Sequence, residues 1–327
     1  MENKEKYYNE RVGFTSLGWL DVSPKNYRFM MEQMKENANK QSYFTLGSAI
    51  HCQVLEPEKF KERYAAIECS IPTGKKADAV RILASTRDYF STPFDWHQNA
   101  IKKADLKGKI ETLSEELINK EPYKSYLSSL IQLRGKEILD VDDAKTISRC
   151  YKNTISHKAA NTLLYDNPFY TSNIKAYNEI KIDWKYPGYK GIIQSTIDRL
   201  IIDNSTKTIK IVDLKTTAKN VYDFEAAYKK YGYYRQAAIY MKSVLWLLNE
   251  KGYNINDYDI ECYIVAVQST GANECDVIKV SNNDLVQGVK EFEIQLERLT
   301  YHIENDLWEY PMEYYESDGI REVCIYE

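Results

Sequence analysis

The sequence predicts an α+β protein in which helices pack on a central β-sheet. Residues 176–216 contain three consecutive segments in which apolar and polar side chains alternate, and this pattern predicts an antiparallel β-meander. A long helical pattern over 223–249 follows the meander. Two more strands, 260–268 and 276–280, and an amphipathic helix over 283–305 complete the arrangement of helices against a sheet.

The helices near the N-terminus have clear start and stop signals. Ser23 followed by Pro24 is typical of a helix N-cap and first turn, and the polar residues 35–43 indicate a loop after this helix. A second helix is expected over 45–56, because its apolar residues recur with helical spacing and Pro57 ends the pattern.

The meander divides into three strands. The first covers 176–185, and a Pro-Gly turn leads into the second, over 190–202. A polar turn at 203–207 leads into the third strand, over 208–216. Hairpin pairing is therefore expected to bring the second and third strands side by side.

We interpret the chain, residues 1–327, as a single domain. Residues 61–160 are mostly charged and follow a helical pattern with several Pro and Gly breakers, which predicts a helical elaboration within that domain. The lysines and arginines of this segment could face a polyanion. The interpretation that we favour is solvated helix faces interleaved with glutamate.

The composition excludes several classes of protein. Lys plus Arg number 44 and Asp plus Glu number 48, so the net charge is −4, which argues against a generally basic, nucleic-acid-coating surface. The six cysteines include no C-x-x-C pair, unlike a zinc ribbon or a cysteine-ligated iron–sulfur cluster. No apolar run approaches the roughly 20 residues of a bilayer span, and the charged N-terminus shows no secretory signal. We expect a cytoplasmic protein without a membrane partner.

Asp213, Leu214 and Lys215 form the strongest candidate for a catalytic motif. An acid, any residue and a lysine occur in this order at six places, and elsewhere the pattern is explained by a solvated surface pair. Here the motif ends a strand whose other face is apolar, and the period of two places Asp213 and Lys215 on the same face.

Asp198 supplies a second carboxylate, near the end of the preceding strand. A hard divalent cation prefers several oxygen ligands, and the hairpin makes a shared site geometrically possible. The strand around Asp198 is rich in isoleucine, where an acid is costly unless it is paired or bound to a metal. An ion pair with Arg199 or with a neighbouring lysine is the alternative, and a metal site is the interpretation that we favour.

Three helical side chains are further candidates. His51 lies four residues after Gly47, and Gln236 and Tyr240 lie four residues apart, so each pair shares a helix face. The alternatives are a packed, hydrogen-bonded histidine and a polar helix face with tyrosines beneath it.

Several blocks of the sequence match a known family in order and spacing. They are 47–51 with 55–57, 191–198, 212–217 and 236–240, together with an opening segment at 16–17 and 23–27. These blocks resemble the RecE-type exonucleases (exonuclease VIII) of the PD-(D/E)xK nuclease superfamily. The resemblance covers about 14–60 and 176–245.

The resemblance implies a restriction-endonuclease-like core, with a central mixed β-sheet flanked by helices and a helical insertion. It also implies that His51, Asp198 and Asp213, with the carbonyl of Leu214, hold Mg²⁺ or Mn²⁺. The proline that the superfamily places before the first acid is absent, since Ile197 precedes Asp198.

The same resemblance implies roles for four more side chains. Lys215 would orient or activate the attacking water and offset charge in the transition state. Gln236 and Tyr240 would position this lysine or the scissile phosphate, and Glu179 would support the site from the preceding strand.

The function implied by the resemblance is a metal-dependent exonuclease that acts on the ends of linear double-stranded DNA. It would proceed 5′ to 3′ and expose a 3′ single strand for a partner annealing protein. A nuclease module of a DNA-repair or CRISPR-adaptation system is one alternative, which the lack of clustered cysteines disfavours. An inactive member of the fold that only binds DNA or protein is another, which the intact Asp198, Asp213 and Lys215 disfavour.

Processive digestion predicts an assembly. A chain with a net charge of −4 cannot hold DNA by general attraction, so processivity would need enclosure of the duplex. Together with the resemblance, this predicts a homo-oligomeric ring of three or four subunits, with part of 61–160 at the subunit contacts.

Overall fold

The computed structural model describes residues 6–37, 45–165, 173–317 and 319–320. The chain divides into two compact units, one made of residues 1–43 with 153–327 and the other of residues 44–152. No helix in the described ranges is both long and apolar enough to cross a membrane.

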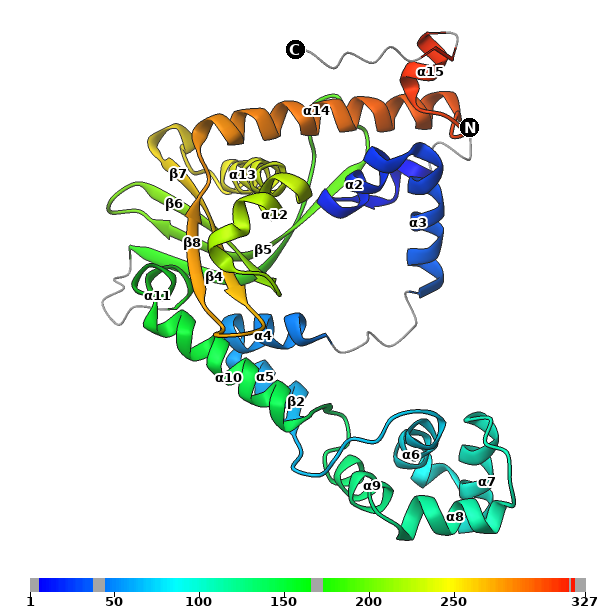
Figure 1. Ribbon diagram of the computed structural model, residues 1–327. Helices are drawn as coiled ribbons and strands as arrows, with labels where there is room; N and C mark the ends of the chain where they lie inside the picture. The colour runs from blue at the N-terminus through cyan, green and yellow to red at the C-terminus, as the bar shows by residue number, and fades with distance from the viewer. Residues whose placement is uncertain (1–5, 38–44, 166–172, 318, 321–327) are drawn as a thin grey trace. The chain divides into compact units, whose positions relative to one another are not determined.

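A six-stranded mixed sheet forms the centre of the first unit (Figure 1). Its strands are β1 (Arg11–Val12), β4 (Ile174–Trp184), β5 (Ile192–Asp203), β6 (Thr208–Thr217), β7 (Asp259–Gln268) and β8 (Cys275–Lys279). The β4–β5–β6 meander is antiparallel, as predicted; β7 runs parallel to β6, and β8 antiparallel to β7. The predicted α+β fold class, a mixed sheet flanked by helices, is therefore confirmed.

β5 pairs with three strands, and the positions of these pairings leave part of one edge of β5 without a partner strand among the described residues. β4 pairs along one edge of β5, including Ile193 opposite Trp184. On the other edge, β1 pairs with residues 192–193 and β6 pairs with residues 199–203. Between these two partners, no described strand pairs with residues 194–198 on that edge. Asp198 lies at the end of this open stretch.

The helix predicted over 223–249 is in fact two helices, α12 (Phe224–Tyr231) and α13 (Tyr233–Glu250). They are separated by Gly232, whose φ of 63° lies in the left-handed region that favours glycine. The sequence pattern continues across this residue, and the prediction of one uninterrupted helix was therefore wrong.

α13 is the helix that covers the sheet. It packs on β4, β5, β6 and β7, and α14 (Asn282–Asn305) packs on α13 and on α2 (Phe14–Val22), so that α13 lies between α14 and the sheet (Figure 1). The core between these layers buries Ile197 and Ile211 from the sheet, Ala238 from α13 and Phe292 from α14. Burial of these apolar side chains is the main source of stability for this arrangement.

The remaining helices of the first unit lie outside this sandwich. They are α3 (Pro24–Asn37), α11 (Lys158–Leu164), α15 (Met312–Glu316) and the short 3₁₀ turns Val221–Asp223 and Ile255–Asp257. The sequence predicted α3 but neither α2 nor β1, since β1 has two residues and α2 lacks a periodic apolar stripe. The predicted loop over 35–43 lies largely outside the described residues.

The second unit is mainly helical and has a core of its own. Its elements are α4 (Leu46–Leu55), α5 (Pro57–Arg63), β2 (Tyr64–Ala66), α6 (Lys75–Thr86), the 3₁₀ turn Arg87–Tyr89, α7 (Pro93–Lys103), α8 (Ile110–Asn119), α9 (Tyr123–Gln132), β3 (Glu137–Leu139) and α10 (Val141–Ser156) as far as residue 152. The core buries Leu83, Ala100, Leu117 and Leu127. β2 and β3 form a parallel pair that the sequence did not predict.

Candidate active site

Asp198 lies where β5 and β6 separate. The last pair between the two strands is Arg199 with Val212, so Asp198 and Asp213 are the next residues along each strand. The backbone N–H of Leu214 donates to Oδ2 of Asp198 at 2.7 Å, and Asp198 is only 7% exposed. This bond attaches the Asp198 carboxylate to the Asp213–Lys215 segment, as the hairpin predicted.

Asp213, which is buried, and Lys215, which is half-buried, form an ion pair on one face of β6. The Nζ of Lys215 lies 2.8 Å from Oδ1 and 2.7 Å from Oδ2 of Asp213. Burial favours the neutral amine of Lys215, but the charges of Asp213 and Asp198 and the hydrogen bond to Asp213 outweigh it, so the pKa of Lys215 lies above its ordinary value. Lys215 is therefore a cation held beside two acids.

Glu179 faces Asp198 across the β4–β5 ladder. The pairing passes from Asn178 with Arg199 to Ile180 with Ile197, which leaves Glu179 and Asp198 directly opposite one another without a ladder pair. Glu179 has a φ of 52°, a strained conformation for a non-glycine residue. A carboxylate oxygen of Glu179 and one of Asp198 lie within 4.8 Å of each other. Strain and like charge therefore coincide at one point of the ladder.

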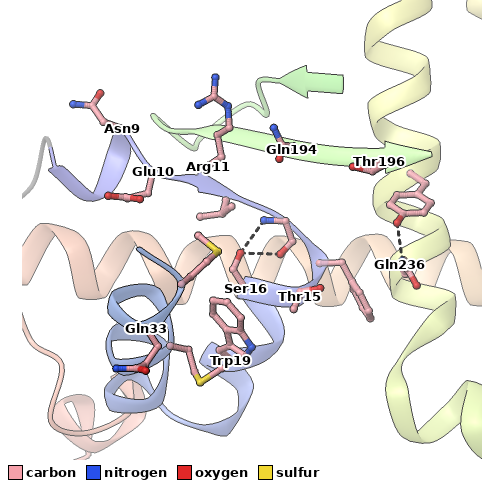
Figure 2. A pocket seen from close by; sticks show the side chains of 16 residues that line it. Asn9, Glu10, Arg11, Thr15, Ser16, Trp19, Gln33, Gln194, Thr196 and Gln236 are labelled. Carbon is pink, nitrogen blue, oxygen red and sulfur yellow. Dashed lines mark hydrogen bonds between the residues drawn. The ribbon is translucent and has the colours of Figure 1, made fainter. Parts of the chain in front are cut away.

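Gln236 and Tyr240 cover these acids from α13. The Nε2 of Gln236 donates to the hydroxyl of Tyr240 at 2.7 Å, and both side chains are buried (Figure 2). Burial, followed by the charges of Asp213 and Asp198, raises the pKa of the Tyr240 phenol. The phenol therefore stays protonated and can act as a hydrogen-bond donor next to the acids.

His51 lies in the second unit. It is half-buried on α4, a helix that starts where the Thr45 side chain accepts a hydrogen bond from the N–H of Ser48. Its role as a metal ligand stays a prediction.

The donor set of the first unit fits a hard divalent cation. Asp198, Asp213 and Glu179 offer carboxylate oxygens, and the backbone of Leu214 adds a carbonyl to the same segment. Like charges as close as those of Glu179 and Asp198 repel one another unless a cation or a proton is present. Oxygen donors of this kind suit Mg²⁺ or Mn²⁺ better than softer metals.

One side chain of the site did not emerge from the sequence motif. The ring centroid of Tyr233 lies 5.2 Å from the Nζ of Lys215, a cation–π distance. Tyr233 is the first residue of α13, directly after Gly232. A helix break at Gly232 would have placed Tyr233 at the start of a helix.

Residues 192–315 match the model of a family described as a PDDEXK-like domain of unknown function (DUF3799). This range contains β5, β6 and α13, and with them Asp198, Asp213, Lys215, Gln236 and Tyr240. The match supports a place for the first unit in the PD-(D/E)xK nuclease superfamily.

A solved structure from Eubacterium rectale, described as a candidate exonuclease, is also similar to this chain. The two share 12% identity with a TM-score of 0.37, over 77% of this chain and 93% of the other. A likeness this distant carries no argument about activity. No curated protein matches the sequence.

Proposed function

We propose that the chain is a metal-dependent exodeoxyribonuclease that hydrolyses phosphodiester bonds from the ends of linear double-stranded DNA. The observation that carries the proposal is the clustering of Asp198, Asp213 and Lys215 at the separation of β5 and β6. The PDDEXK-like match over residues 192–315 supports it. In keeping with the RecE-type resemblance, digestion runs 5′ to 3′ and leaves a 3′ single strand.

The acids are the proposed metal ligands. Asp198, Asp213 and the carbonyl of Leu214 hold Mg²⁺ or Mn²⁺, with His51 as a further ligand and Glu179 as a supporting acid. When bound, the metal would lower the pKa of a water molecule and stabilise charge on the phosphate oxygens.

The protein's own groups supply the remaining chemistry. Lys215 is cationic and half-buried, so it can donate hydrogen bonds to a phosphate oxygen or to the attacking water as negative charge develops. Gln236 and Tyr240 donate from the other side of the site, and their mutual hydrogen bond fixes both orientations. No nucleophilic side chain is needed.

The proposed partners are a single-strand annealing protein and further copies of this chain. A ring of three or four subunits would enclose the duplex and allow processive digestion despite the net charge of −4. Light scattering at micromolar concentration measures the subunit number directly. A strict monomer that digests long duplexes without dissociating would contradict the ring.

The activity is tested with linear duplex DNA labelled at either the 5′ or the 3′ end, beside covalently closed circular DNA of the same sequence. We expect label release from the linear substrate with Mg²⁺, none with EDTA, and an intact circle. Early release of the 5′ label as mononucleotide supports 5′ to 3′ polarity. Cleavage of the circle would mean an endonuclease, and no Mg²⁺-dependent hydrolysis of any substrate would reject the nuclease assignment.

A further inference from the structure

A pocket of about 800 Å³ opens beside the candidate active site within the first unit (Figure 2). It is bounded by residues 9–16, by α2 and α3, by the open edge of β5 and by the start of α13. Gln236 and Tyr240 belong to both the pocket and the site. Thr196 lines the pocket two residues before Asp198 on the same strand. A molecule in this pocket would therefore lie next to the acids.

Neutral groups provide most of the polar lining. They are the amides of Asn9, Gln33 and Gln194 and the hydroxyls of Thr15, Ser16 and Thr196. Amides and hydroxyls both donate and accept hydrogen bonds, as the edges of a nucleobase do.

The two charged side chains of the lining are already paired. Arg11 donates to Asp183 at 2.7 Å, and Glu10 forms an ion pair with Lys35. Among the residues that the structure describes, no lysine lines the pocket. The lining therefore offers little positive charge to neutralise a phosphate or another anion. It favours a neutral, polar ligand instead.

Aromatic and thioether side chains supply the apolar surface. Trp19 and Phe14 line the pocket from α2, and Met30 and Met34 line it from α3. Figure 2 shows Trp19 below Ser16 and beside Gln33, so a ring that stacked on the indole would have polar groups around its edge. Stacking on aromatic side chains is the usual way in which proteins hold unpaired bases of any sequence.

The wall formed by residues 13–16 is fixed in place. A Cβ added at Gly13 would lie 2.7 Å from the backbone oxygen of Gln194, so only glycine permits this close approach to β5. The N–H of Gly13 donates to the Ser16 hydroxyl at 2.8 Å, and that hydroxyl donates back to the Gly13 carbonyl at 3.1 Å. A pocket whose wall is held in this way loses little entropy on binding.

We propose that this pocket binds the unpaired base of the nucleotide next to the bond that is cut. The proposal rests on the proposed nuclease function and adds to it a site for single-stranded nucleic acid. The base stacks on Trp19 and hydrogen-bonds to the amides and hydroxyls around it, while its phosphate reaches the acids past Thr196.

Substrates that lack single bases test this proposal. Each is the same linear duplex with one abasic nucleotide, placed at the labelled end or at one of the next positions. We expect an abasic nucleotide at the position that occupies the pocket to raise KM about tenfold, with kcat on saturating substrate little changed, because a stacking contact has been removed. Abasic nucleotides further from the end should have no effect.

Two variants of the pocket and one control complete the test. Trp19→Leu removes the stacking surface, and Gln33→Leu removes an amide. Each variant should have a higher KM for the intact substrate than the wild type. Each should also show a smaller ratio between the KM of the abasic substrate and the KM of the intact one. Gln287→Leu is the matched control, since Gln287 is exposed on α14 and does not line this pocket. Its KM should equal that of the wild type.

The possible outcomes distinguish a failure of the base-pocket proposal from a failure of the nuclease proposal. Active protein that uses intact and abasic ends equally well overturns the base pocket and leaves the nuclease assignment standing. If no hydrolysis is found, the Kd of a short single-stranded oligonucleotide, measured by fluorescence anisotropy with Ca²⁺, replaces KM in the same comparison. Equal affinity in the wild type, Trp19→Leu and Gln33→Leu would then overturn the proposal.

Discussion

Glu179 and Asp198 lie directly opposite each other on β4 and β5, with carboxylate oxygens within 4.8 Å, at a point where neither is a ladder partner of the other. Glu179 also has a positive φ there. Two acids and a strained backbone in one place are costly for the metal-free protein, and this cost is typical of a site that a ligand completes.

Glu179→Gln should therefore act differently on the metal-free and metal-bound protein. Removing one of the two like charges should raise the Tm of the metal-free protein or leave it unchanged. It should also reduce the Tm increase that Mg²⁺ or Mn²⁺ produces, because a bound cation gains less from a single acid. Thermal unfolding with and without metal measures both effects.

Asp203→Asn is the matched control for this measurement. Asp203 lies at the end of the neighbouring strand β5, where it accepts hydrogen bonds from the turn residues Ser205 and Thr206. The Asp203→Asn variant should show the same metal-induced increase in Tm as the wild type. An increase in Glu179→Gln as large as in the wild type would show that Glu179 has no part in metal binding.

Lys215→Met should destabilise the metal-free protein by roughly 3 kcal/mol, because it leaves the buried carboxylate of Asp213 without its cation. Adding Asp213→Asn to this variant should restore much of the loss. Urea unfolding of the two single variants and the double variant gives the coupling energy between the side chains. Strictly additive effects would contradict the ion pair.

Gly288→Ala should disturb the helix that carries Gln236 and Tyr240. A Cβ at Gly288 would lie 2.8 Å from the Cβ of Ala238 and 2.8 Å from the backbone oxygen of Tyr234, where α13 and α14 touch. We expect a loss of about 1–3 kcal/mol in the free energy of unfolding, with lower activity.

The control for this substitution is Gly18→Ala in α2. Nothing lies within 4 Å of a Cβ at Gly18, so alanine should stabilise the helix by about 0.5–1 kcal/mol. Chemical denaturation of both variants measures the contrast. Equal stability of the two would mean that α13 and α14 are not packed so closely.

His302 should make the stability depend on pH. Burial lowers the pKa of His302 by more than its bond to the Leu307 carbonyl raises it, so the unfolded chain takes up a proton at higher pH than the folded one. Stability then falls as pH decreases below the ordinary histidine pKa of about 6.5. In His302→Gln the loss of stability between about pH 7.5 and about pH 5.5 should be smaller than in the wild type. The same loss in both proteins would contradict this assignment.

The strands were the part of the fold that the sequence predicted best. More and less buried residues alternate along most of β4 and in the first part of β5 and of β6, and this period of two is visible in the sequence. The break at Gly232 was missed because apolar residues continue on both sides of it, so periodicity alone could not show a change of direction. β1 was missed because two residues carry no period.

The sequence named the side chains of the candidate site, whose roles stay predictions, but it did not show their geometry. The motif around Asp213 and the spacing of Gln236 and Tyr240 identified side chains that the structure places around one point. The opposition of Glu179 and Asp198 depends on the β4–β5 register, and the pocket depends on the approach of Gly13 to Gln194, which no local pattern encodes. The position of His51 in the site stays a prediction.

The most direct test of the central claim is the hydrolysis of linear duplex DNA with Mg²⁺ by Asp198→Asn, measured beside the wild type at equal concentration. Asparagine keeps an oxygen that can accept from the N–H of Leu214, so the variant should fold with a Tm near that of the wild type while it loses the charge that the metal requires. We expect hydrolysis at the level of the EDTA control. Hydrolysis at the wild-type rate would contradict the assignment of this acid cluster as a metal-dependent active site.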